Sequence, residues 1–120
     1  MKKNRRLSAG FRAAFEGFRE TLVFERVFRV MLAITLIVIG AMLYFPTSRL
    51  EKVVLLASIF AVLVLELINS VVERIMNFLS PEYSEQARIV KDLMAAIVLL
   101  ASIGAVVIGI IIFSPYIVNR

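Results

Sequence analysis

The sequence predicts an all-α membrane protein with an N-terminal amphipathic interfacial helix followed by three transmembrane helices. The chain has 120 residues, of which 61% are hydrophobic, whereas soluble domains contain roughly 45–50% apolar residues. A soluble domain of this length has too small a core to bury so much apolar surface. The apolar residues also fall into three long stretches, and the N-terminal segment places them at helical spacing. We therefore expect a single integral membrane domain over residues 1–120.

The N-terminal segment, about residues 6–26, is the predicted interfacial helix. One face of it carries a row of apolar side chains at intervals of three or four residues: Leu7, Phe11, Phe15, Phe18 and Leu22. Charged residues lie mostly elsewhere around the helix, so the segment is too polar to cross the bilayer. We expect it to lie in the cytoplasmic interface with its phenylalanines at the acyl boundary. The alternative is that this face packs against the protein's own helices.

Three apolar stretches after this segment have the length of transmembrane helices. Each is close to the roughly 17–25 residues that a helix needs to cross the hydrocarbon layer. We expect the membrane helices at about residues 28–46, 50–78 and 88–114. Because the connection between the first two is short, these two helices should form an antiparallel pair.

Two polar connections separate the membrane helices. In the first, Pro46 ends a helix and either Thr47 or Ser48 can cap the next one. In the second, the sequence SPE at residues 80–82 predicts an N-cap, a first helical residue and an acidic residue that suits the helix dipole. A helix that begins there can run directly into the third membrane span.

The net charge of +5 is unevenly distributed along the chain. Eight of the 14 basic residues lie in the first 29 positions: Lys2, Lys3, Arg5, Arg6, Arg12, Arg19, Arg26 and Arg29. The positive-inside rule then predicts a multi-pass protein with the N-terminus in the cytoplasm and the C-terminus outside. Anionic lipid head groups are a better counterion for this basic end than nucleic acid. The charged amphipathic segment also argues against a cleavable signal peptide.

Several classes of chemistry are excluded by composition and motif. The chain has neither cysteine nor histidine, which excludes disulfides and argues against a zinc site. Any metal would be held by oxygen ligands, which suits magnesium. No Walker A sequence, GxGxxG sequence or protein-kinase signature occurs. Bound ATP would therefore be held without a soluble nucleotide-binding fold.

A polar stripe interrupts the second membrane helix. Glu66, Asn69 and Glu73 fall within roughly 60° of one another on a helical projection. An ionisable group inside a membrane span is costly, which makes it a functional-site hypothesis by default. The stripe lies in the predicted cytoplasmic half of the helix. Glu25, before the first span, and Lys91 and Asp92, at the start of the third, should reach the same level.

This set of residues suggests phosphoryl transfer. Carboxylates and an amide can hold a hard divalent cation, a lysine can pair with phosphate oxygens, and a carboxylate can accept the proton of an attacking hydroxyl. Structural interpretations remain open for single residues. Glu73 can be a solvated charge near a helix end, Asn69 can bond a neighbouring helix, and a protonated Glu66 can form an interhelical hydrogen bond.

Three local patterns resemble the small membrane-integral diacylglycerol kinases of bacteria and their undecaprenol kinase relatives. LELINSVVE at residues 65–73 is similar to the family signature E-[IL]-[IL]-N-[ST]-x-x-E. FERVFR at residues 24–29 is similar to an E-x-x-F-R segment, and EYSEQARIVKD at residues 82–92 to an acidic loop that ends in K-D. The three occur in order and at family-like spacing, and the resemblance extends without obvious gaps over residues 6–113.

The resemblance implies a homotrimer with composite active sites and a set of residue roles. Glu66 would be the general base for the lipid hydroxyl, and Glu25 and Glu73 would bind magnesium beside the nucleotide. Four further residues would contact the nucleotide or support the site: Asn69, Glu82, Lys91 and Asp92. Arg6 would lie near the entrance for lipid and nucleotide. The chain departs from the family at Asn77, where many members have Asp, and at Ser84, where His is common.

The implied reaction is magnesium-dependent phosphorylation of a membrane lipid alcohol by ATP. Diacylglycerol is the favoured acceptor, because the match extends through the N-terminal segment, and undecaprenol is the alternative within the family. A hypothesis of a different class is a non-catalytic oligomeric scaffold or channel, in which Glu66 and Asn69 would line an aqueous path.

Overall fold

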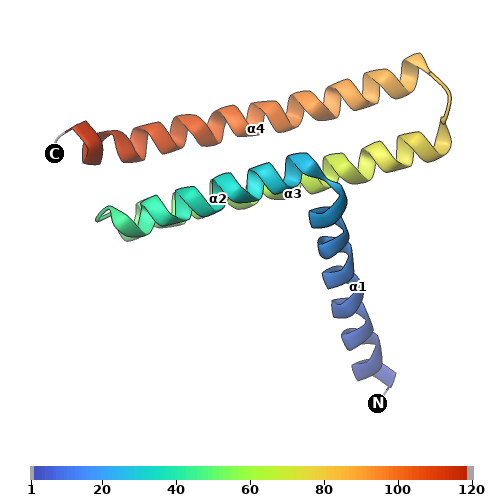
Figure 1. The fold of residues 1–120 in the computed structure, drawn as a ribbon, viewed down its shortest axis with the longest axis horizontal. Helices are drawn as coiled ribbons and strands as arrows, with labels where there is room; N and C mark the ends of the chain where they lie inside the picture. Colours follow the sequence, from blue (N-terminus) through green and yellow to red (C-terminus); the bar gives the residue numbers. More distant parts are fainter. Residues whose placement is uncertain (1, 119–120) are drawn as a thin grey trace.

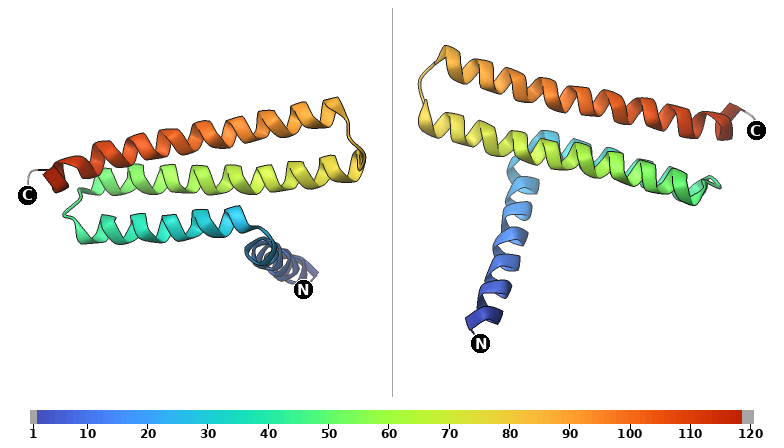
Figure 2. Two further views of the ribbon diagram at one scale, coloured as in Figure 1. Left: turned by 45° about the horizontal axis from the view of Figure 1, so that its top comes forward. Right: turned by 180° about the vertical axis from the view of Figure 1, so that it is seen from behind.

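The computed structural model describes the backbone of residues 2–118 and the side chains of residues 5–118. Four helices follow one another: α1 (Lys2–Phe24), α2 (Arg26–Tyr44), α3 (Arg49–Leu79) and α4 (Glu85–Val118). The described residues contain no strand, so the prediction of an all-α fold is confirmed. Helices α2, α3 and α4 lie side by side, and α1 runs across their direction (Figure 1 and Figure 2).

Three of the helices are long and apolar enough to cross a membrane: α2, α3 and α4. Their outer faces carry large aliphatic side chains that the rest of the chain leaves exposed, such as Ile37 at 71% and Leu100 at 73%. A monomeric soluble protein rarely exposes apolar surface on this scale, and contact with lipid accounts for it. The expectation of three membrane spans is therefore confirmed.

Helix α1 is amphipathic and makes little contact with the bundle. Phe11 is 77% exposed and Phe15 is 71% exposed, so most of the predicted apolar row does not pack against the protein's own helices. Only the C-terminal part of α1 reaches the bundle, where the Phe18 ring meets Phe28 edge-on at a centroid distance of 5.6 Å. The orientation of α1 across the bundle is the one expected of a helix that lies in the membrane interface.

The connection between α2 and α3 is a capped turn. Ser48 caps α3, because its hydroxyl accepts the Glu51 N–H at 3.1 Å while the Glu51 carboxylate accepts the Ser48 N–H at 2.8 Å. This reciprocal pair is a capping box. The Thr47 hydroxyl is instead turned back to donate to the Met42 carbonyl at 2.9 Å. Of the two predicted caps, Ser48 is thus the one used.

The connection between α3 and α4 differs from the prediction. Ser80 does not begin a helix: its N–H donates to the Met76 carbonyl at 2.9 Å, which makes Ser80 the C-cap of α3. Helix α4 begins later, at Glu85, and the Ser84 hydroxyl accepts the Ala87 N–H at 3.4 Å. The prediction that the last helix begins at residues 80–82 is therefore wrong. Helix α3 continues to Leu79, so Ser80 caps the end of α3 instead of the start of α4.

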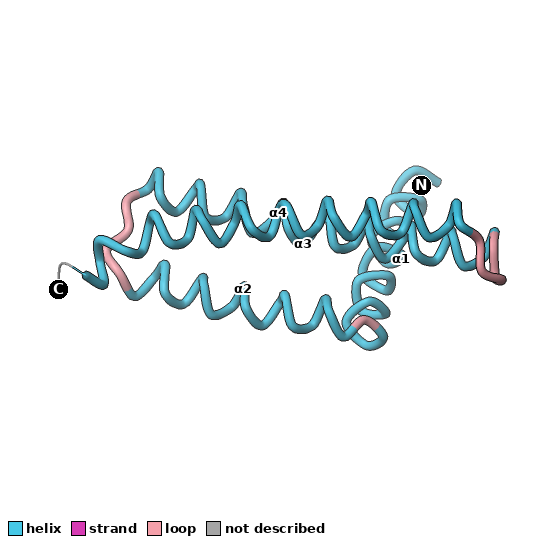
Figure 3. Tube along the Cα trace, turned by 90° about the horizontal axis from the view of Figure 1, so that it is seen from above, coloured by secondary structure: helices cyan, strands magenta, loops and turns pink. Residues whose placement is uncertain are grey.

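The bundle is most firmly closed at the end that holds the α2–α3 turn. Met42, Leu55 and Ile112 form a buried cluster there. The Tyr116 hydroxyl, near the end of α4, donates to Glu51 at 2.5 Å, and its ring stacks on Phe45. At the opposite end, α3 and α4 project beyond the junction of α1 and α2 (Figure 1 and Figure 3). Polar groups are placed mainly at this projecting end.

Replacing Ser48 by Ala should lower the stability of the protein by about 1 kcal/mol, because it removes the N-cap of α3. The measurement is equilibrium unfolding in mixed micelles as the fraction of denaturing detergent is raised. Ser114→Ala is the matched control, since Ser114 is exposed and makes no side-chain hydrogen bond in the described part of the chain. Equal stability of the two variants would contradict the importance of the capping box.

Candidate active site at the junction of α1, α2 and α3

Glu25 is the single residue that separates α1 from α2. Its backbone is extended, with φ −106° and ψ 102°, so the chain turns sharply there. The Glu25 N–H still donates to the Thr21 carbonyl at 2.9 Å, and its carbonyl accepts the Arg29 N–H at 3.2 Å. The last turn of α1 and the first turn of α2 therefore both hydrogen-bond to Glu25. The Glu25 side chain makes no capping bond to α2 and remains available for other contacts.

Two contacts hold this junction in one shape. The Phe28 side chain is only 1% exposed and packs against Phe18 across the turn. The Arg29 guanidinium donates to two carbonyls of the last turn of α1, those of Leu22 at 3.0 Å and Val23 at 2.7 Å. A cation at a helix C-terminus also stabilises the helix dipole. Sequence reasoning assigned no role to Arg29, although its position in the FERVFR segment was a signal.

The polar stripe of α3 faces this junction. Glu66 is 6% exposed, and its carboxylate interacts electrostatically with those of Glu25 and Glu73 and lies within hydrogen-bonding reach of the Asn69 side chain. The structure therefore brings together four of the predicted site residues, from α3 and from the α1–α2 junction. A buried carboxylate beside two others requires a compensating cation.

A compensating cation within the chain is Arg74, which sequence reasoning missed. Its Nη2 atom lies 3.6 Å from Glu25 Oε1, and its side chain is 54% exposed. This distance is longer than that of a normal hydrogen bond, roughly 2.7–3.2 Å. Arg74 therefore lowers the negative potential of the site without fixing the Glu25 carboxylate in a tight pair.

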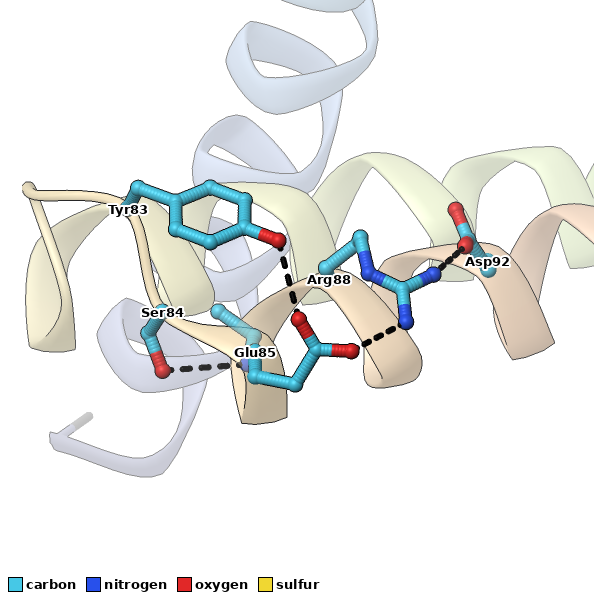
Figure 4. A network of polar contacts seen from close by, with 6 residues as sticks. Tyr83, Ser84, Glu85, Arg88 and Asp92 are labelled. Atoms are coloured by element: carbon cyan, nitrogen blue, oxygen red, sulfur yellow. Dashed lines mark hydrogen bonds and ion pairs between the residues drawn. The ribbon is translucent and has the colours of Figure 1, made fainter.

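The predicted residues of α4 have local partners instead. Asp92 accepts a bond from Arg88 at 2.8 Å, and Arg88 also pairs with Glu85, which in turn accepts the Tyr83 hydroxyl at 2.9 Å (Figure 4). The Asp92 side chain is 66% exposed. Within one chain, Asp92 is held on the surface of α4 by Arg88.

Lys91, Glu82 and Arg6 are also outside the cluster around Glu66. The Lys91 ammonium donates to Asn77 Oδ1 at 2.6 Å, which ties the start of α4 to the projecting end of α3. Glu82 is exposed in the α3–α4 connection, and Arg6 is exposed on α1. Neither side chain forms a hydrogen bond or ion pair within residues 5–118.

The oxygen ligands at this site suit magnesium in type but do not form a complete cage. Among the described residues, no three acidic side chains are close enough together to hold a metal ion. Mg²⁺ commonly binds through only one or two carboxylates, with waters and substrate phosphates as the other ligands. In ligand type, the carboxylates of Glu25 and Glu73 suit such partial coordination.

The fold and this cluster define a class: a multi-pass membrane protein with a buried acidic site where an interfacial helix joins the membrane bundle. The model of the prokaryotic diacylglycerol kinase family matches residues 12–113. The chain belongs to that family and is a membrane-integral lipid kinase. The hypothesis of a non-catalytic scaffold or channel is thereby set aside.

Individual relatives agree with this assignment. The chain is 28% identical over 100 residues to the diacylglycerol kinase of Escherichia coli K12, covering 83% of this chain and 80% of that protein. It is 33% identical over 104 residues to the diacylglycerol kinase of Synechocystis, covering 86% of this chain and 59% of that protein. The diacylglycerol kinase of Shigella flexneri gives the same 28% over 100 residues.

The structure predicts that Arg29→Met loosens the α1–α2 junction. Loss of two bonds from a charged donor should raise the exchange rate of the amides of residues 21–25 by roughly five- to tenfold, since such bonds contribute about 1 kcal/mol or more. The measurement is hydrogen–deuterium exchange of the protein in lipid nanodiscs. Arg26→Met is the control, because Arg26 is exposed and has no side-chain partner in residues 5–118. Unchanged exchange in Arg29→Met would show that Phe28 alone fixes the turn.

Proposed function

We propose that the protein transfers the γ-phosphoryl group of magnesium-bound ATP to the hydroxyl of diacylglycerol, which gives phosphatidic acid and ADP. The observation that carries this proposal is the buried Glu66 carboxylate beside Glu25 and Glu73. A carboxylate at this depth can meet the hydroxyl of a lipid. Two carboxylates nearer the end of the bundle can meet a cation and its phosphates.

Glu66 is the proposed general base. Its side chain is buried, so water is largely excluded from it, and its carboxylate interacts electrostatically with Glu25 at the α1–α2 junction. In this environment a carboxylate that accepts the proton of the lipid hydroxyl loses an unfavourable charge, so proton transfer relieves part of the cost of burial. Asn69 orients the Glu66 carboxylate through its side-chain amide.

Glu25 and Glu73 are the proposed magnesium ligands. The ion, when bound, would neutralise the phosphates and bring them to the site. Glu25 suits this role because the junction fixes its backbone while its carboxylate is engaged only by the long contact to Arg74. Glu73 lies two helical turns beyond Glu66, about 10 Å at 1.5 Å per residue, which separates the level of the phosphates from that of the proton acceptor.

The nucleotide contacts are proposed to come from several elements. Lys91 would bind phosphate oxygens; Asn69, Glu82 and Asp92 would contact or support the nucleotide, and Arg6 would lie near the entrance. The bond from Lys91 to the neutral Asn77 side chain leaves the lysine charge uncompensated, which supports this role. Because Asp92 and Arg6 lie outside the Glu66 cluster of the same chain, we propose that a homotrimer completes each site with residues of a second copy.

Two further parts of the proposal are the acceptor lipid and the orientation of the protein in the membrane. The relatives that the chain matches are diacylglycerol kinases, which supports diacylglycerol as the acceptor, and undecaprenol is the competing lipid alcohol. The basic N-terminal segment supports a cytoplasmic location for α1 in the inner membrane of a bacterium, with the C-terminus outside. This orientation would place Glu25 and Glu73 on the side of the membrane that contains ATP.

Replacing Glu66 by Gln should reduce phosphorylation of diacylglycerol by about 10²- to 10⁴-fold, the usual effect of removing a general base. The assay incubates the protein in bilayers containing diacylglycerol or undecaprenol with radiolabelled ATP and Mg²⁺, and follows label in the lipid. Glu16→Gln is the control, since Glu16 is exposed on α1. Label in undecaprenol alone would correct the acceptor, and no label in either lipid from folded protein would falsify the proposed reaction.

The magnesium requirement should depend on Glu73. Chelation should stop the reaction and added Mg²⁺ should restore it. In Glu73→Gln the Mg²⁺ concentration for half-maximal activity should rise roughly tenfold or more, because a charged oxygen ligand is lost. The same titration of Glu16→Gln should match the wild type. A normal magnesium requirement in Glu73→Gln would remove Glu73 from the metal site.

A further inference from the structure

A cleft between α1 and α3 adjoins the Glu66 cluster through Arg74, which lines the cleft and contacts Glu25. It has a volume of about 350 Å³, within the roughly 300–1,000 Å³ of typical small-molecule sites. Its lining from α1 includes Gly17, Phe18 and Thr21, and its lining from α3 includes Ser70 and Arg74. The cleft is therefore formed where the interfacial helix meets the membrane bundle, on the side of α3 next to its polar stripe.

Two side chains in this cleft are hydrogen-bond donors with unused capacity. Ser70 is only 7% exposed, yet its hydroxyl has no hydrogen-bond partner among the described residues. Arg74 has five N–H donors, and its only side-chain partner in residues 5–118 is Glu25, at 3.6 Å. Thr21, the other hydroxyl of the cleft, already donates to the Gly17 carbonyl at 2.9 Å. The free donors are thus Ser70 and Arg74.

The position of these donors indicates what they bind. Along α3, Ser70 lies one turn and Arg74 two turns beyond Glu66, toward the level of Glu25 and Glu73. A lipid whose hydroxyl meets Glu66 has its ester groups on the membrane side of that hydroxyl, away from Ser70 and Arg74. The phosphate arrives from the opposite side. A guanidinium and a hydroxyl that converge from one wall are suited to phosphate oxygens.

We propose that Ser70 and Arg74 bind the phosphoryl group while it is transferred, and that they then hold the phosphate of the lipid product. This inference rests on the proposed function, in which Glu66 accepts the hydroxyl proton. The lipid oxygen forms a bond to the γ-phosphorus as the bond from that phosphorus to the β,γ-bridging oxygen breaks. The hydroxyl proton passes to Glu66, and ADP leaves. Arg74 and Ser70 stabilise the charge on the non-bridging oxygens during this exchange.

The acidic surroundings explain why an arginine is needed. Glu25, Glu66 and Glu73 would repel an incoming phosphate, and Glu20 also lines the cleft. Arg74 is the basic residue that lies among them, and its long contact with Glu25 leaves most of its donors free. A lysine in its place would supply the charge but not the planar fork of donors.

The test uses the full-length protein in nanodiscs containing diacylglycerol, with kcat, KM and inhibition by phosphatidic acid as readouts. Arg74→Met should lower kcat by about 10- to 100-fold, less than a fully buried oxyanion donor because Arg74 is half exposed, and Ser70→Ala by roughly two- to tenfold. The KM for diacylglycerol should change little in both. Phosphatidic acid should inhibit Arg74→Met more weakly than the wild type, and Arg74→Lys should recover part of kcat.

Matched controls are Arg49→Met, an exposed arginine at the other end of α3, and Ser114→Ala. Wild-type kcat in both Arg74→Met and Ser70→Ala would overturn the inference while leaving the proposed reaction intact. A rise in the KM for diacylglycerol at constant kcat would overturn it in favour of acceptor binding. A change confined to the magnesium requirement would show that Arg74 only orients Glu25. Failure of the wild type to label any lipid would instead overturn the proposed function.

Discussion

The desolvation of Glu66 is the constraint on which the rest of the structure depends. A carboxylate that is 6% exposed in a membrane helix is costly unless nearby groups compensate its charge. Glu25 and Glu73 add to the cost, because their negative charges act on the Glu66 carboxylate. Within the chain, Arg74 supplies a positive charge at the edge of the site and offsets part of it. The remaining negative charge favours the approach of a cation.

The two ends of the bundle differ in how their side chains pack. At the α2–α3 turn, the capping box of Ser48, the buried Leu55 and the bond from Tyr116 to Glu51 close the helices onto one another. Near the junction with α1, polar side chains replace this apolar packing, and α3 and α4 project beyond it (Figure 1).

The interfacial helix is more than a membrane anchor in this arrangement. Arg29 holds the last turn of α1, and Phe28 packs against Phe18, so the orientation of α1 and the position of Glu25 are set by the same contacts. The cleft beside Ser70 also requires α1 as one of its walls. A change in the depth or tilt of α1 in the interface would therefore move Glu25 and one wall of the cleft.

The sequence by itself determined the features that depend on local periodicity and composition. The amphipathic segment, the three spans, and the stripe of Glu66, Asn69 and Glu73 follow from helical geometry, which is the same whatever the helix packs against. The family signature also lies within one continuous stretch of α3. These features include the residues proposed for proton transfer and metal binding.

Only the tertiary structure decided which side chains of different helices meet. Arg74 lies beside Glu25 while remaining half exposed, Arg29 reaches back to α1, and Asp92 is held by Arg88 on α4 rather than joining the Glu66 cluster. The start of α4 at Glu85, instead of at Ser80, likewise depended on how far α3 continued. Such outcomes depend on the rotation and length of each helix relative to its neighbours, which no periodicity within one segment determines.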